Sequence, residues 1–424
     1  MNRLLDFKPL ADVTLPSAGK IPCAGLTLIV GPNSSGKTQF LNDLYSRLCG
    51  EPRRLIVAET VEINKPDYKL LIQYLERDGY LRRRVNPGNG REELVARTTY
   101  VGTGQALPII EVNQAEAWYS AYDGTPDIQS SRPNAFLGYF GRLLVTRLSL
   151  DRRLLAFGAL GVINFESDPP AHDLHAFHID DRARRILAAE SHETFGKALW
   201  SDNMGGNLLC LRVNDGPLPS AEDRLSFEKM TGYRTIETEG DGLKSYAAIC
   251  IALLLKQRPV CLIDEPETCL HPPQAYSLGR FIARHGVSKD VATFVATHSS
   301  QVLRGIVQST QEVEIVRLTR NGGQFHARRL PAQDLVIALK KPTLRAESIL
   351  DGIFSESVVI VEADGDRLVY HTTWETLAEE LRLDVHFAAV GGLGGVADAC
   401  RLYRTLHIPV AIIADLARII HRSA

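Results

Sequence analysis

The eight-residue segment GPNSSGKT at 31–38 restricts the fold of this chain more than any other segment. It fits the pattern G-x-x-x-x-G-K-[ST] and directly follows the apolar run GLTLIV at 25–30. The residues after it predict a helix from Lys37 to Leu48. A buried strand, a glycine-rich turn and a helix in that order are the setting in which this pattern forms a phosphate-binding P-loop. The sequence therefore predicts an α/β protein with a P-loop.

The predicted P-loop has a specific chemistry. Its main-chain N–H groups are expected to surround phosphate oxygens at the positively polarised N-terminus of the helix. Lys37 would reach the β- and γ-phosphates of a nucleotide and take part in catalysis, and the Thr38 hydroxyl would bind Mg²⁺. The predicted nucleotide-binding residues of this loop are Asn33, Ser34, Ser35, Gly36, Lys37 and Thr38.

A second acidic motif, CLIDE at 261–265, predicts a buried strand with a charged end. Asp264 would hold Mg²⁺ through water, and Glu265 would polarise the attacking water. Acidic strand ends are common in α/β proteins, but the P-loop upstream favours the catalytic interpretation. His298 follows the predicted strand VATFVAT at 291–297, which should lie beside the Asp264 strand. This histidine can contact the γ-phosphate, or it can be an ordinary surface or capping residue.

Strands and helices alternate along most of the chain, which predicts a largely parallel sheet. The segment RRLIVAE at 53–59 is expected to be a strand. The stretch 61–235 is expected to hold core strands and an inserted, partly helical region, with a helical patch at 68–84. Further on, we expect helices at 243–257 and 273–286 and strands at 259–264, 291–298 and 312–318.

A separate α/β unit is predicted to begin near residue 356. ESVVIVEADGD starts with a strand, and RLVYHTTWETLAEELRL predicts a helix. VHFAAVGG, VADACRLYRTLH and PVAIIADL then predict strand, helix and strand. The sequence thus predicts one domain at 1–345 and a second, partial one at 356–424.

Composition excludes several classes of protein. With 45% hydrophobic and 23% charged residues and a net charge of -2, the chain is typical of a globular protein and not of a strongly basic nucleic-acid binder. Its seven cysteines form no CxxC pair, which argues against a zinc ribbon or a disulfide framework. No apolar run is long enough for a secretory signal or a membrane span, so we expect a cytoplasmic protein with no membrane partner.

Some basic residues could contact DNA phosphates, although such groups are more often solvated: Arg82–Arg84, Arg142, Arg147, Arg152–Arg153 and Lys340–Lys341.

The P-loop, DEPETCLHP at 264–272 and ATHSSQVL at 296–303 together resemble the ABC-type ATPases of the overcoming lysogenization defect (OLD) family. The resemblance implies an ATPase head with an inserted helical subdomain, ATP and Mg²⁺ as cofactors, and a homodimer or higher oligomer that encloses two ATP molecules. The corresponding signature motif is EGDGLKS at 239–245, where Gly240 replaces the usual serine and removes a hydroxyl donor. It implies contacts from Gly240, Gly242 and Ser245 to the nucleotide of a partner subunit, although the same residues also fit a plain glycine turn at a helix start. His271, in the LHP sequence, is typical of this family or belongs to a structural turn.

The segment VVIVEADGD at 358–366 is similar to the first motif of a Toprim domain, the Mg²⁺-dependent module of OLD-type nucleases. The resemblance implies that Glu362, Asp366 and Asp415 hold a metal ion. Glu362 and Asp366 could instead act in acid–base chemistry, or simply form a solvated strand end. Where the family has a D-x-D motif, this chain has Asp415 followed by Ala417. We therefore expect a truncated Toprim domain, with the apolar residues of its third strand exposed.

Three functions fit these features. The first is an ATP-powered nuclease, or the ATPase half of one, that acts in DNA processing or antiviral defence through ATP-dependent dimerisation, with DNA as a partner. The second is a nuclease-inactive ATP switch that scaffolds a separate effector protein, and the missing second aspartate favours it for this chain. The third is a repair ATPase related to the SMC proteins, against which the lack of a long heptad repeat argues.

Overall fold

A computed structural model gives the fold. It describes residues 8–414 apart from the segments 78, 97–106, 125–133, 159, 165–169, 171, 204–206, 226–228, 230–231, 256–257, 331, 334, 336–346 and 378–383.

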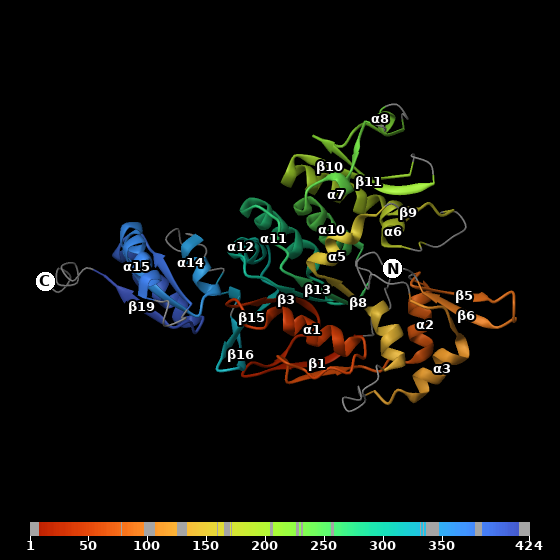
Figure 1. The fold of residues 1–424 in the computed structure, drawn as a ribbon, viewed down its shortest axis with the longest axis horizontal. Helices are drawn as coiled ribbons and strands as arrows, with labels where there is room; N and C mark the ends of the chain where they lie inside the picture. The colour runs from red at the N-terminus through yellow and green to blue at the C-terminus, as the bar shows by residue number, and fades with distance from the viewer. Residues whose placement is uncertain are drawn as a thin grey trace.

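A six-stranded sheet forms the centre of the larger part of the molecule, in the order β16-β15-β3-β14-β13-β8 (Figure 1). All neighbouring strands are parallel except β15 and β16, which form an antiparallel hairpin. The predicted α/β class with a largely parallel sheet is confirmed. The strands are β3 (Gly25–Val30), β8 (Val145–Leu148), β13 (Val260–Asp264), β14 (Ala292–Ala296), β15 (Val313–Asn321) and β16 (Gln324–Leu330).

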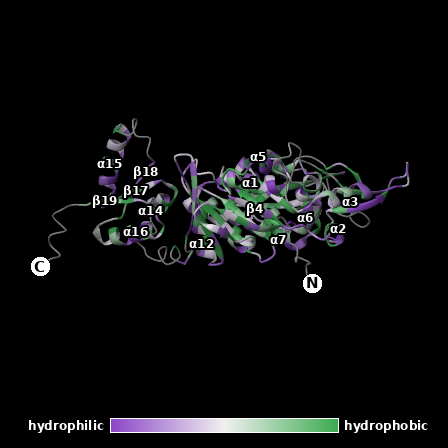
Figure 2. Cartoon of the chain, turned by 90° about the horizontal axis from the view of Figure 1, so that it is seen from below, coloured by the Kyte–Doolittle hydropathy of each residue, from purple (hydrophilic) through white to green (hydrophobic). Residues whose placement is uncertain are grey.

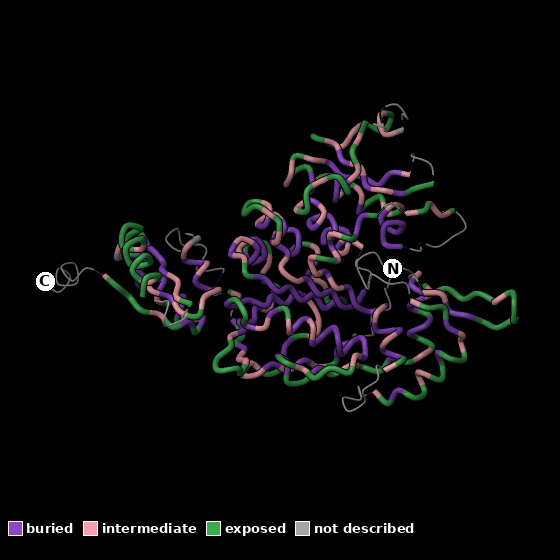
Figure 3. Tube along the Cα trace, in the orientation of Figure 1, coloured by how far each residue is buried: buried purple, intermediate pink, exposed green. Residues whose placement is uncertain are grey.

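Helices cover both faces of this sheet because side chains alternate along each buried strand. Ile29 packs with Phe40 and Leu44 of α1 (Lys37–Leu48) on one face. Leu28 and Val30 face the opposite core, which is built by α10 (Asp241–Leu255), α11 (Pro272–Gly286) and α12 (Ser300–Ser309). Figure 3 shows the strands of this sheet as an almost continuous buried layer. The predicted helices at 37–48, 243–257 and 273–286 are confirmed with small shifts at their ends.

The predicted strand at 53–59 is wrong. A strand begins only at Thr60, and β4 (Thr60–Ile63) joins β1 (Leu10–Leu15) and β2 (Gly19–Ile21) in the order β2-β1-β4. The Asp43 carboxylate of α1 accepts hydrogen bonds from the N–H groups of residues 56, 57 and 58, at 3.0, 2.7 and 3.0 Å. Because a side chain binds these donors, the segment needs no strand partner and forms a loop against α1.

The stretch between β4 and β8 forms a small unit with its own core, which combines two helices with the antiparallel sheet β5-β6-β7. The predicted helical patch at 68–84 ends at Arg77, and 81–85 is a strand. Gly79, with φ of 73°, has the left-handed backbone that ends helices. The elements are α2 (Tyr68–Arg77), β5 (Leu81–Val85), β6 (Glu92–Ala96), β7 (Ile110–Glu111) and α3 (Val112–Ala121).

Short helical segments flank β8 and lead to a second antiparallel sheet. A π-helical turn at Leu137–Gly141 touches the end of α1 so closely that a Cβ atom on Gly141 would lie 1.8 Å from the Leu48 carbonyl oxygen. The second sheet has the order β10-β11-β12, with β9 also paired to β11. The elements are α4 (Arg142–Leu144), α5 (Leu150–Leu154), a 3₁₀ turn at Leu155–Phe157, β9 (Leu160–Gly161), α6 (Asp173–Ile179), α7 (Asp181–Phe195), β10 (Lys197–Asp202), β11 (Leu208–Asp215), α8 (Ala221–Leu225), β12 (Arg234–Thr235) and a 3₁₀ turn at Ile236–Thr238.

The predicted C-terminal unit has three parallel strands in the order β18-β17-β19, with the strand and helix order expected from the sequence. Ile412 and Ile413 of the edge strand β19 are 47% and 36% exposed, which agrees with the expected exposure of the third strand. Arg317 of β15 donates to the carbonyl oxygens of Ile353 and Ser355, at 3.2 and 2.6 Å, and so joins the central sheet to the start of this unit. The elements are α14 (Glu347–Asp351), a 3₁₀ turn at Gly352–Phe354, β17 (Ser357–Val361), α15 (Asp364–Leu377), β18 (Val385–Ala389), α16 (Leu393–Thr405) and β19 (Val410–Ile413).

Hydropathy follows the layers of the fold, and the most apolar residues gather along the central sheet and the helices on it (Figure 2). Within the part of the chain that the structure describes, no helix combines the length and the apolar character that a bilayer crossing requires.

We expect Asp43→Ala to lower the free energy of unfolding by about 2 kcal/mol, because it leaves three main-chain N–H groups without their acceptor. Urea denaturation without nucleotide measures the loss. Glu59→Ala removes an exposed carboxylate from the end of the same loop and serves as the control. Equal unfolding midpoints for the two variants would contradict this account of the loop.

Candidate nucleotide site

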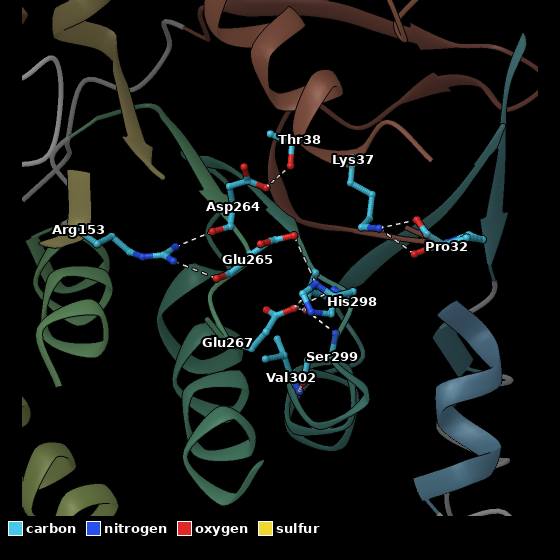
Figure 4. Close-up of polar contacts among 12 residues, drawn as sticks. Pro32, Lys37, Thr38, Arg153, Asp264, Glu265, Glu267, His298, Ser299 and Val302 are labelled. Carbon is cyan, nitrogen blue, oxygen red and sulfur yellow. Dashed lines mark hydrogen bonds and ion pairs between the residues drawn. The ribbon is translucent and has the colours of Figure 1, made fainter. Parts of the chain in front are cut away.

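The register of the parallel strands brings three sequence-distant segments to one edge of the sheet. Ile29 of β3 lies opposite Ala296 of β14, and Ala296 lies opposite Asp264 of β13. The P-loop, the segment after β14 and the turn after β13 therefore leave the sheet at the same level. Figure 4 shows Thr38 pointing toward Asp264, and His298 pointing toward Glu265 and Glu267. The sequence predicted that the strand before His298 neighbours the Asp264 strand, and this is confirmed.

The Lys37 side chain is folded back onto its own loop. Its Nζ atom donates to the carbonyl oxygens of Gly31 and Pro32, each at 2.8 Å, and the side chain is 7% exposed. Burial lowers the pKa of Lys37, and the carboxylates of Glu265 and Glu267 partly oppose this effect. A buried ammonium group held by neutral carbonyl oxygens is well placed to gain from an incoming anion.

The P-loop backbone uses left-handed conformations at Ser34 and Gly36, with φ of 62° and 95°. Asn33, Ser34 and Thr38 are exposed, whereas Ser35 is 2% exposed. The predicted loop thus opens to solvent along one side.

Thr38 and Asp264 meet at the start of α1 and the end of β13. The Thr38 hydroxyl donates to Asp264 Oδ1 at 3.0 Å. Burial raises the pKa of Asp264, and the Thr38 hydrogen bond opposes this to a smaller degree. The hydroxyl and the carboxylate are hard oxygen ligands of the kind that Mg²⁺ prefers. A divalent cation would also stabilise the charged form of this poorly solvated carboxylate.

Glu265, Glu267 and His298 form a cluster beside this pair (Figure 4). His298 Nδ1 lies 3.4 Å from Glu265 Oε1 and 3.2 Å from Glu267 Oε1. Glu267 is 9% exposed and also accepts from the Thr297 hydroxyl and the His298 N–H, both at 2.8 Å. Sequence reasoning assigned no role to Glu267, although it lies two residues after Glu265 in the EPET sequence. Its position orients His298 toward Glu265.

Arg153 lies in the protein interior and hydrogen-bonds the turn after β13. This arginine is fully buried, and its guanidinium donates to the carbonyl oxygens of Leu148, Asp264 and Glu265, at 3.0, 2.6 and 3.0 Å. Glu265 has a φ of 45°, which is unusual for a residue other than glycine, and its N–H also donates to Ala296 at 2.8 Å. These bonds fix the strained backbone that presents the Glu265 side chain.

The suggestion that Arg153 contacts DNA is therefore wrong, because the side chain does not reach the surface. No motif marked it as part of the site. The only sequence feature that could have pointed to a buried Arg153 was its position beside the leucines of the segment after β8.

Three of the other basic residues have partners within the protein. Arg83 pairs with Glu76 at 2.6 Å, and Arg84 pairs with Glu93 at 2.8 Å. Arg147 hydrogen-bonds Asn42 and lies over the Tyr45 ring, 5.1 Å from its centroid. Lys340–Lys341 lie outside the described residues.

The signature-like segment lies at the N-terminus of α10. Gly240 is exposed, as a contact with a partner subunit requires. A Cβ atom on Gly242 would lie 2.5 Å from the Cys269 carbonyl oxygen, so this glycine allows α10 to approach the turn after β13. Ser245 is fully buried, so the implied contact of its hydroxyl with a partner's nucleotide disagrees with its position.

His271 precedes α11, and its main-chain N–H donates to the Gln274 side chain at 3.1 Å, which is the hydrogen bonding expected of a structural turn.

The C-terminal unit places two of its three predicted metal ligands near the end of β17. Glu362 follows that strand and is 7% exposed. Asp366, in the first turn of α15, accepts from the Ala363 N–H at 3.1 Å. Asp415 lies outside the described residues, and these contain no group of three His, Cys, Asp or Glu side chains suited to a metal ion.

A cleft of about 1090 Å³ opens at the P-loop. Its walls are the P-loop with the first turn of α1, the loop 54–59, Glu265, the turn at Pro16–Ser17 between β1 and β2, and the tip of the β15–β16 hairpin. This volume is sufficient for a nucleoside triphosphate.

Comparison with known proteins agrees with this geometry. Residues 210–304 match the family model described as "AAA domain, putative AbiEii toxin, Type IV TA system". Residues 353–416 match the model of the TOPRIM domain of overcoming lysogenization defect protein-like proteins. A search of curated proteins gave no match.

Solved structures with similar folds include SMC head domains. The chain shares 13% identity with an SMC head bound to the C-terminal winged-helix domain of ScpA, with 78% of this chain and 100% of that one covered and a TM-score of 0.41. The SMC head domain from Thermotoga maritima shows 13% identity, 76% and 99% coverage and a TM-score of 0.35.

The sheet, the P-loop and the acidic cluster define an ABC-type ATPase. An ATPase-domain match at 210–304 and an OLD-like Toprim match at 353–416 support the combination of domains that the sequence motifs indicated.

We expect Arg153→Met to lower the free energy of unfolding by about 3 kcal/mol and to reduce ATP turnover, because three carbonyl oxygens lose their donor and the Glu265 backbone loses its support. Thermal unfolding and phosphate release measure the two effects. Arg152→Met, at the half-buried neighbouring arginine, is the control. It should lower the free energy of unfolding and the rate of ATP turnover less than Arg153→Met does. A fully active and stable Arg153→Met protein would show that the guanidinium does not organise the site.

Proposed function

We propose that the cleft at residues 31–38 binds ATP with Mg²⁺ and hydrolyses it, and that this activity controls the assembly of the chain with a second copy of itself. The observation that carries the proposal is the arrangement of Lys37, Thr38, Asp264 and Glu265 around one strand edge, where phosphate, metal and water chemistry can meet.

Lys37 would change partners when a nucleotide binds. Its Nζ atom now uses two main-chain carbonyl oxygens, at 2.8 Å each. Phosphate oxygens carry negative charge and are stronger acceptors, so the ammonium group would move onto the β- and γ-phosphates. The N–H groups of residues 33–38 would bind the remaining phosphate oxygens at the N-terminus of α1.

Thr38 and Asp264 are the residues that would hold Mg²⁺ in this site, Asp264 through water. The bound ion would neutralise part of the charge on the phosphates. On the protein side, Asp264 is oriented by the hydrogen bond from Arg153 to its carbonyl oxygen, at 2.6 Å.

Glu265 is the proposed general base. Its carboxylate would accept a proton from a water molecule aligned with the γ-phosphate. His298, held by Glu267, lies 3.4 Å from Glu265 and would hold the base or the phosphate in position. The three side chains therefore form a catalytic group in which Glu267 acts only by positioning His298.

Dimerisation is proposed from the exposed N-terminal end of α10. Gly240 is exposed, and the main-chain N–H groups of a helix N-terminus suit a phosphate oxygen presented by another subunit. The buried position of Ser245 leaves Gly240 and Gly242 as the residues of the predicted set for that contact.

Glu265→Gln should bind ATP with near-normal affinity and hydrolyse it about 10²- to 10⁴-fold more slowly, because the amide cannot accept the proton. The ATP-bound variant should accumulate as a dimer, measured by light scattering during size-exclusion chromatography. Lys37→Ala is the companion variant, and calorimetry should show that it binds ATP weakly or not at all. If Glu265→Gln hydrolyses ATP as fast as the unmutated protein does, Glu265 is not the general base.

The role of the C-terminal unit separates two proposals. A nuclease that cuts DNA would use Glu362, Asp366 and Asp415 to hold divalent metal. A switch would instead use the unit, or another surface, to carry a separate effector protein. The switch is favoured by Ala417 in place of the second aspartate. The nuclease-type ATPase would act in DNA processing or antiviral defence.

If the switch proposal is right, the protein should hydrolyse ATP without converting supercoiled plasmid to nicked or linear forms, in Mg²⁺ or in Mn²⁺. Agarose-gel analysis of plasmid incubated with protein and ATP tests this. Cleavage that disappears in Glu362→Ala but persists in Glu375→Ala, an exposed glutamate on α15, would establish the nuclease instead.

A further inference from the structure

The part of the cleft beyond the P-loop has a wall that the phosphate chemistry does not use. It consists of Pro16 and Ser17, the loop at 54–59, and Arg320, Phe325 and His326 of the β15–β16 hairpin. Among the described residues that line the cleft, Phe325 is the only phenyl ring.

The hairpin rests directly on the P-loop backbone. A Cβ atom on Gly31 would lie 2.1 Å from the Leu318 carbonyl oxygen, and one on Gly36 would lie 2.7 Å from Cε1 of Phe325. These two P-loop glycines therefore leave room for the hairpin as well as for phosphate. Because the Phe325 edge packs on Gly36, the ring has a fixed place next to the phosphate-binding loop.

A tight turn and two contacts make the hairpin tip a defined surface. Gly322 and Gly323, with φ of 56° and 91°, form the tight turn between the paired residues 321 and 324. The Ala327 N–H donates to the Pro16 carbonyl oxygen at 2.8 Å. His326 Nδ1 lies 3.3 Å from the Ser17 hydroxyl, which joins the hairpin to the β1–β2 turn on the same wall.

The tip pairs an aromatic ring with a cation. The Arg320 guanidinium lies 5.2 Å from the centre of the Phe325 ring. Arg320 is exposed and Phe325 half-buried, so both present surface to the cleft. A phenyl ring and a planar guanidinium are the side chains on which nucleobases stack, and the guanidinium also attracts the phosphates of the same ligand.

We propose that Arg320 and Phe325 form the platform that receives the purine base of the nucleotide. The site is thereby composite: the N-terminal P-loop binds the phosphates, and the hairpin, almost 300 residues later in the chain, binds the base. This inference rests on the proposed ATP site and adds the recognition of the nucleoside half of the ligand.

Calorimetry with two ligands, Mg²⁺–ATP and Mg²⁺–tripolyphosphate, tests the platform. Tripolyphosphate offers the phosphate chain without a base, so it reports the P-loop alone. Phe325→Ala should weaken ATP binding about tenfold and leave tripolyphosphate binding unchanged. Arg320→Ala should weaken ATP binding more than tripolyphosphate binding, because the guanidinium stacks with the base and also attracts phosphates. Phe325→Tyr keeps the ring and should retain the affinity for ATP. Arg328→Ala, at an exposed arginine of β16 that does not line the cleft, is the control and should bind both ligands normally.

The outcomes are separable. If the unmutated protein does not bind ATP, the proposed function fails, and this inference with it. If the unmutated protein binds ATP but Phe325→Ala binds it equally well, only the platform is refuted. If Phe325→Ala loses ATP and tripolyphosphate to the same extent, the ring supports the P-loop backbone and is not a base-binding surface.

Discussion

The buried guanidinium of Arg153 is the interaction on which the geometry of the site depends. It binds the carbonyl oxygens that end β8 and β13 and that of Glu265, and it does so without contact with solvent. A charged group in the interior is tolerated only where it is well hydrogen-bonded, and here the main-chain oxygens supply those partners. The strained turn at Glu265 is held in place as a consequence, with its carboxylate directed toward His298.

The site is assembled at the edge where parallel strands end. The residues around it come from positions near 37, 153, 265, 298 and 325, and no two of these segments are neighbours in sequence. Parallel register places the ends of β3, β14 and β13 at one level, and the antiparallel partner of β15 turns back over the P-loop. The same edge also connects to the C-terminal unit, because Arg317 of β15 binds the turn that leads into β17.

Sequence patterns predicted the elements whose signals are local. The helix after the P-loop, the strand before Asp264 and the three strands of the C-terminal unit have strong periodicity or strong apolar runs, and they are confirmed. The strand expected at 53–59 did not form because the main-chain N–H groups of residues 56–58 bind the Asp43 carboxylate, 13 to 15 positions away, and no local pattern records that contact. Arg153 and Glu267 were missed as site residues for a similar reason, since their partners are main-chain groups and side chains brought close only by the fold.

By itself, the sequence determined that this chain has a P-loop, an acidic strand end and a C-terminal unit similar to a Toprim domain, because these depend on residue type at short spacing. Only the tertiary structure decided that Arg153 supports the turn at Glu265, that Ser245 is buried, and that the β15–β16 hairpin forms a wall of the cleft. Those facts follow from packing between distant segments, and side-chain burial and long-range contacts are set by the whole fold and not by any one stretch of it.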